Sequence, residues 1–140
     1  MVDIKIKARP IGAKAVLGRL GHPRVTSETK GGLEVVTGAS EPGFNPLDLM
    51  FASLASCLVL SGRIAASKLG ILDKLTEVRA HVTGEKAHEE PSRIVRFIVS
   101  LDVDGDLTAR QKAEIAHLAE EICTVSNTLK GTPAFLVEIA

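Results

Sequence analysis

Residues 45–70 read NPLDLMFASLASCLVLSGRIAASKLG, and this stretch decides the fold. Asn45 is a suitable N-cap, Pro46 suits the first helical position, and Asp48 adds a carboxylate to the first turn. Gly70 is suited to the residue that ends a helix. We therefore predict a helix of about 24 residues, ~36 Å long at a rise of 1.5 Å per residue.

The predicted helix is apolar around most of its circumference. A projection at 100° per residue groups three polar side chains, Ser56, Arg63 and Ser67, within a stripe roughly 40° wide, and most of the remaining surface is Leu, Ala, Met, Phe, Val and Ile. A helix with so narrow a polar face is covered on several sides. We expect it to lie at the centre of the fold.

Segments with the alternating pattern of β-strands lie on both sides of this helix. Those before it are 2–8, 13–17, 25–28 and 33–37, and those after it are 76–83, 93–103 and 134–139. Thr108 and Gln111 form a capping box for a second helix that ends near Cys123, and a short helical piece covers 126–130. The order predicts an α+β fold, with antiparallel sheets around a long central helix and residues 1–140 as a single domain.

Composition and charge exclude several classes of function. The chain has 17 basic and 17 acidic residues, so it lacks the basic surface of a nucleic-acid binder. Its N-terminus has no secretory signal pattern. The longest apolar stretch, 49–60, is shorter than the ~20 residues of a membrane span. We expect a soluble, cytoplasmic protein that binds neither nucleic acid nor membrane.

The two cysteines, Cys57 and Cys123, are 66 positions apart. In a reducing cytosol they are expected as free or redox-active thiols rather than as a stable disulfide. Cys57 lies among Ala and Leu, where a cysteine is usually a core residue, and a nucleophile there needs a nearby cation from elsewhere in the chain. Cys123 could resolve a sulfenic acid on Cys57 if the two Cα atoms lie within ~7 Å.

The histidines His22, His81, His88 and His117 are scattered without the spacing of metal ligands. Two cysteines so far apart do not make a zinc site either, so we expect neither a metal nor a cofactor. A Cys–His hydrolase that pairs Cys57 with His81 or His117 is an alternative of another reaction class.

Two segments resemble motifs of the OsmC/Ohr family, the osmotically inducible C and organic hydroperoxide resistance proteins. Residues 45–57, NPLDLMFASLASC, resemble its N-P-x-[DE]-L-hhAshAsC segment, and residues 123–129, CTVSNTL, resemble its C-[PTS]-[VI]-S-x-x-L segment. The similarity covers nearly the whole chain. Residues 89–107 are closest to the OsmC-like branch of the family.

The resemblance implies an intertwined homodimer with two active sites at the subunit interface. It implies that Cys57 attacks the O–O bond of an organic hydroperoxide and that Cys123 resolves the sulfenic acid by forming a disulfide. A lipoyl-type dithiol would then reduce that disulfide. An arginine from the N-terminal strands would hold the thiolate; Arg19 fits this element best, and Arg24 is the other candidate.

The sequence departs from the Ohr-type pattern ten positions before Cys57, where those enzymes carry Glu and this chain has Leu47. The neighbouring Asp48 lies on the opposite helix face from Cys57 and ~13 Å away along the axis, so we interpret it as a first-turn capping residue.

Two hypotheses about the function follow. One is a thiol-dependent, peroxiredoxin-like hydroperoxide reductase of the oxidative-stress response; the other is a non-catalytic ligand-binding or stress-associated dimer of the same fold.

Overall fold

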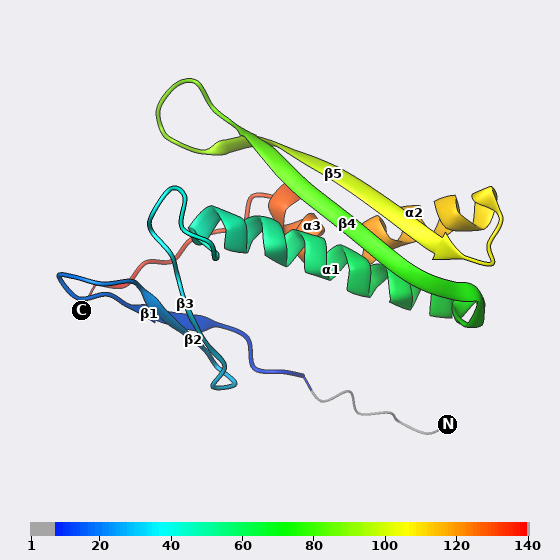
Figure 1. Cartoon of the computed structure of the whole chain (residues 1–140), viewed down its shortest axis with the longest axis horizontal. Helices are drawn as coiled ribbons and strands as arrows, with labels where there is room; N and C mark the ends of the chain where they lie inside the picture. The colour runs from blue at the N-terminus through cyan, green and yellow to red at the C-terminus, as the bar shows by residue number, and fades with distance from the viewer. Residues whose placement is uncertain (1–7, 140) are drawn as a thin grey trace. The chain divides into compact units, whose positions relative to one another are not determined.

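The computed structural model describes residues 8–139, so the predicted strand 2–8 lies outside the described residues except for Ala8. The chain divides into two compact units, one ending at Leu49 and the other beginning at Met50. The elements of both units are labelled in Figure 1.

The N-terminal unit contains an antiparallel sheet with the strand order β1-β2-β3. Its strands are β1 (Ala13–Val16), β2 (Arg24–Ser27) and β3 (Gly32–Glu34). These are three of the predicted strands, and β3 ends three residues earlier than expected. After β3, the backbone N–H of Val35 still donates to the carbonyl of Pro23 at 2.9 Å, and the N–H of Val36 then donates to the carbonyl of Phe44 at 3.0 Å, which takes the chain away from β2.

The long helix α1 (Pro46–Lys68) confirms the helix predicted from residues 45–70. At its start, the side chain of Asn45 accepts from the N–H of Asp48 at 2.8 Å, and that of Asp48 accepts from the N–H of Asn45 at 3.0 Å. At its end, Gly70 has a φ of 74°, and the N–H of Ile71 donates to the carbonyl of Ala66 at 2.9 Å. Reciprocal capping at one end and a left-handed glycine at the other fix both ends of the helix.

The second unit folds around α1. Strands β4 (Leu75–Lys86) and β5 (Ile94–Gly105) form a two-stranded antiparallel ribbon, preceded by the short turn η1 (Leu72–Lys74). Figure 1 shows this ribbon running alongside α1. The chain then forms α2 (Ala109–Ile122) and α3 (Thr124–Lys130), as the capping box at Thr108 and Gln111 predicts.

The ribbon and α1 approach closely where glycines face larger side chains. A Cβ on Gly62 would lie 3.0 Å from Cγ1 of Val78, and one on Gly84 would lie 2.9 Å from the ring of Phe51. A larger residue at either place would force the facing side chain to move, so the two glycines allow this close packing. The contact encloses two groups of buried residues: Leu54, Leu58, Val82 and Cys123 in one, and Ala65, Ala66, Val103 and Ile115 in the other.

The predicted strand 134–139 is wrong for the single chain. Residues 134–139 have no assigned secondary structure and belong to neither of the two described sheets. Its apolar side chains Phe135, Leu136, Val137 and Ile139 are 75–95% exposed. A strand needs a neighbour to complete its hydrogen-bond ladder, and alternation alone does not supply one.

As a possible membrane span, the helix α1 is longer than the apolar stretch 49–60 that the sequence analysis considered. α1 has 23 residues, and its most apolar 18-residue window has a mean hydropathy of 1.7, so it could cross a membrane by length and composition; a third of that window is buried within the chain. The apolar character continues past Arg63 through residues 64–66. A core helix of a soluble protein passes the same test, so these two properties alone do not indicate a membrane protein.

Candidate active site

Cys57 and Cys123 lie together in the second unit. Both are free thiols; Cys57 on α1 is half-buried, and Cys123 is completely buried. Cys57 packs against the core cluster that contains Cys123, and each side chain shifts the pKa of the other through hydrogen bonding. The fold thus joins two residues that are 66 positions apart, as a peroxidatic and resolving pair requires.

The junction between α2 and α3 determines the position of Cys123. This residue is the C-cap of α2 and the N-cap of α3, with φ of −70° and ψ of 110°. Its Sγ accepts a hydrogen bond of 3.4 Å from the backbone N–H of Ser126. The sulfur caps α3, so that helix begins two residues earlier than predicted.

The protonation of Cys57 is governed by two opposing effects. Burial raises the pKa of its thiol, but hydrogen bonds lower it further, so that the pKa lies below its ordinary value. In decreasing order, these bonds involve the side chain of Cys123, the backbone of Val125, the side chain of Ser61 and the backbone of Thr124. Donors of this kind stabilise a thiolate.

Cys123 is shifted in the opposite direction. Burial raises the pKa of its thiol, and the hydrogen bond to Cys57 raises it further. Cys57 is therefore the sulfur that ionises first, and Cys123 is the thiol that donates to it. This order fits the resemblance, in which Cys57 is the attacking residue.

Three of the four donors to Cys57 come from groups that the sequence analysis did not single out. Ser61 could have been found, because residues four positions apart share a helix face. The backbone groups of Thr124 and Val125 could not, since their position depends on how α3 packs beside α1.

Both candidate arginines lie in the N-terminal unit and are exposed. Arg19 is in the loop between β1 and β2, and Arg24 begins β2, where it pairs with Val16 and Glu34 in the sheet register. Which arginine stabilises the Cys57 thiolate stays a prediction.

Asp48 is the capping residue that the sequence indicated.

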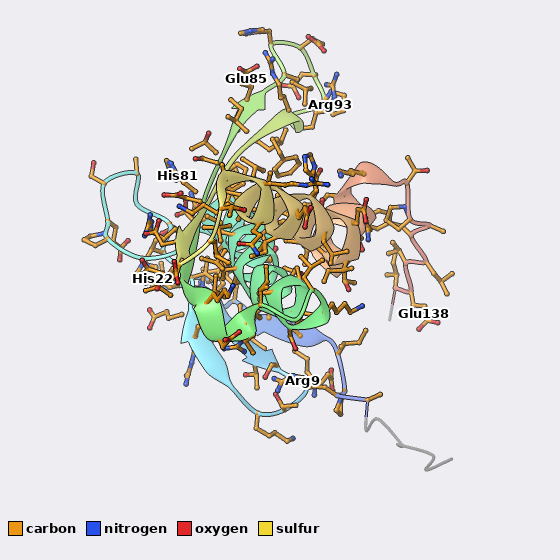
Figure 2. All side chains as sticks on the ribbon, turned by 90° about the vertical axis from the view of Figure 1, so that its right-hand side faces the viewer. Arg9, His22, His81, Glu85, Arg93 and Glu138 are labelled. Atoms are coloured by element: carbon orange, nitrogen blue, oxygen red, sulfur yellow. The ribbon has the colours of Figure 1, made fainter. Side chains whose placement is uncertain are left out.

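The two histidines considered for a hydrolase are placed differently. Ala80 and Val82 pack in the same core cluster as Cys57, and His81, which alternates with them on β4, is exposed; it is labelled in Figure 2. His117 lines a pocket instead. The hydrogen-bond partners that lower the Cys57 pKa are a thiol, a hydroxyl and backbone groups, not an imidazole.

A pocket of about 560 Å³ lies between α1, β5, α2 and α3; it borders the core cluster around the two cysteines, and neither cysteine is among its lining residues. Most of its lining is apolar and includes Leu54, Leu58, Phe97 and Leu129, which also pack in the core cluster that contains both cysteines. Its polar members are His117, Glu120, Ser126 and Lys130. Within residues 8–139, no group of three or more His, Cys, Asp or Glu side chains is arranged to hold a metal ion.

Comparison with known sequences identifies one family. The profile described as "OsmC-like protein" matches residues 38–138 of this chain. A relative from Haloferax volcanii, described as an uncharacterized protein, is 30% identical over 95 residues, which cover 68% of this chain and 70% of the relative.

Comparison with solved structures identifies the same fold. The OsmC-like protein of Mycoplasma pneumoniae matches with a TM-score of 0.74 at 17% identity, over 89% of this chain and 90% of that one. An organic hydroperoxide resistance protein from Elizabethkingia anophelis matches with a TM-score of 0.69 at 22% identity, over 91% and 92%. One from Legionella pneumophila matches with a TM-score of 0.68 at 22% identity, over 90% and 93%.

Proposed function

This chain belongs to the OsmC-like protein family, and from that membership and its thiol pair we propose that it reduces organic hydroperoxides. The observation that carries the proposal is the hydrogen bond between Cys57 and Cys123, whose pKa values are shifted in opposite directions. In this proposal, Cys57 attacks because its thiol has the lowered pKa, and Cys123, in the same core cluster, forms the disulfide with it.

The proposed cycle uses these two sulfurs, a peroxide of the form ROOH and a dithiol reductant. The Cys57 thiolate attacks the terminal oxygen, so an S–O bond forms, the O–O bond breaks, and the alkoxide takes a proton from solvent to become an alcohol. Cys123 then attacks the sulfur of the sulfenic acid, and its proton leaves with hydroxide as water. A dithiol of the lipoyl type reduces the resulting disulfide to two thiols.

The apolar lining of the adjoining pocket supports an organic peroxide over hydrogen peroxide. Leu54 and Leu58 on α1 belong both to this lining and to the core cluster that contains the cysteines. An apolar R group gains free energy when such walls remove it from water. For the cation near the thiolate we propose Arg19, with Arg24 as the alternative.

We further propose that the protein is a cytoplasmic homodimer with active sites at the interface. On α1, the apolar side chains of Leu60 and Ile64 are 51% and 48% exposed in the single chain. The apolar C-terminal segment 135–139 is exposed as well. A second copy that covers these surfaces would give α1 the central position its composition indicates.

A non-catalytic dimer that binds a small apolar ligand is the second candidate. The pocket of about 560 Å³ favours it, because that volume is typical of small-molecule sites. Leu47 favours it too, since it stands where Ohr-type enzymes carry Glu. In this case the thiol pair would be structural.

Single-turnover mixing with an organic hydroperoxide separates the two candidates. We expect the reduced protein to consume peroxide at least about tenfold faster than free cysteine, because its thiol is more ionised at neutral pH. Cys57→Ser should lose this reaction. Equal consumption by the wild type and Cys57→Ser would exclude the peroxidase and leave the ligand-binding protein.

A further inference from the structure

Ser61 is an unusual residue in α1 because it is polar and only 5% exposed. A buried hydroxyl is normally hydrogen-bonded, and serines inside helices commonly donate to a carbonyl in the preceding turn. Two exposed serines of α1 do so: Ser53 donates to the carbonyl of Met50 at 2.7 Å, and Ser56 to that of Ser53 at 3.2 Å. The hydroxyl of Ser61, four residues after Cys57 on the same helix, is one of the hydrogen-bonding groups that lower the pKa of the Cys57 thiol.

The geometry of the helix explains this contact. Residues four positions apart lie on the same face, and each Cα–Cβ bond tilts towards the N-terminus. The side chain of Ser61 therefore leans back over the turn that carries Cys57. Ser53 has the same spacing on the other side, but its side chain leans away from Cys57 towards the helix N-terminus.

We propose that the Ser61 hydroxyl donates a hydrogen bond to the Cys57 thiolate and thereby helps to set the reactivity of this sulfur. The inference deepens the proposed function, because it rests on Cys57 as the nucleophile. Ser61 belongs to the same helix as Cys57, so its donor is present however the N-terminal unit and its arginines are placed. The other donors come from Cys123 and the start of α3.

The rate of Cys57 alkylation by iodoacetamide as a function of pH tests this role. We expect Ser61→Ala to raise the midpoint of the profile by about one pH unit, the lower end of what the loss of one hydrogen bond to a charged group gives. About one pH unit below the midpoint, the rate should fall only about threefold, because a more basic thiolate is intrinsically more nucleophilic. Peptide mass spectrometry assigns the label to Cys57 rather than to the buried Cys123.

Two further variants act as controls. Ser53→Ala removes a hydroxyl at the same distance along the helix and should keep the wild-type midpoint. Ser61→Thr retains the hydroxyl and should restore the midpoint that Ser61→Ala loses. An unchanged midpoint in Ser61→Ala, an equal rise in Ser53→Ala, or a rise in Ser61→Thr as large as in Ser61→Ala would overturn the inference.

The assay also separates this inference from the proposed function, because alkylation requires no peroxide. A Ser61-dependent midpoint in a protein that does not consume peroxide would support the role of Ser61 and exclude the peroxidase. Peroxide consumption with an unchanged midpoint in Ser61→Ala would support the peroxidase and exclude the role of Ser61.

Discussion

Cys57 and Cys123 share one hydrogen bond but experience different surroundings. Cys57 is half-buried and receives bonds from donors on α1 and at the start of α3, so hydrogen bonding outweighs the effect of burial on its pKa. Cys123 is completely buried, and its hydrogen bond to Cys57 reinforces the effect of burial. The roles of nucleophile and resolving thiol thus follow from position within the pair.

The pH dependence of thiolate formation tests this division. We expect Cys57 to titrate below the ordinary thiol pKa of ~8.5, because its hydrogen bonds favour the charged form. Replacing its partner in Cys123→Ala should raise the midpoint, since this substitution removes the first of those bonds. The measurement is the ultraviolet absorbance of the thiolate in a pH titration, with Cys57→Ser as the blank. A wild-type midpoint at or above that of free cysteine would contradict the account.

For individual residues, the sequence indicated the two cysteines of the candidate site but not that they lie in contact. Their motifs singled out Cys57 and Cys123, whereas their contact depends on how the start of α3 packs beside α1. The spacing of Ser61 from Cys57 was available in the sequence. Its importance became visible only when the structure showed that Ser61 is buried.

Among the elements, α1 was the most predictable because its ends carry local signals. Asn45 and Asp48 cap each other at the start, and Gly70 adopts the left-handed conformation that ends the helix. These interactions involve only neighbours in the sequence. The helix begins and ends within one residue of the predicted boundaries.

Elements that need distant partners were less predictable. The strands β4 and β5 extend a few residues beyond the predicted segments because each lengthens the ladder of the other. The segment 134–139 has the same alternation but no strand partner in the described part of the chain. Alternation therefore predicts the ability to form a strand, and pairing decides whether one forms.

For the whole molecule, the single chain leaves apolar surface that a soluble protein normally covers. Leu60 and Ile64 lie on α1 beside the polar stripe, and the C-terminal segment 135–139 exposes further apolar side chains. The family match spans residues 38–138 and so crosses the boundary between the two compact units. The exposed apolar surface is the reason for the homodimer proposed above, and that residues 1–140 form a single domain stays a prediction.

Oligomeric state tests this proposal. We expect a dimer by sedimentation equilibrium at micromolar concentrations. Ile64→Glu should raise the dissociation constant at least about tenfold, because burying an unpaired charge costs more than 1.4 kcal/mol. Ser67→Glu, on the predicted polar stripe of the same helix, is the matched control and should remain dimeric. A monomeric wild type would rule out an interfacial active site.

The most direct test of the central claim is the mass of the reduced protein after one equivalent of an organic hydroperoxide, followed by peptide mapping. The account predicts that the wild type loses two hydrogen atoms and yields a peptide that links Cys57 to Cys123. It also predicts that Cys123→Ser instead gains one oxygen atom, as a sulfenic acid on Cys57. Unchanged masses, or oxygen added to Cys123 while Cys57 stays reduced, would contradict it.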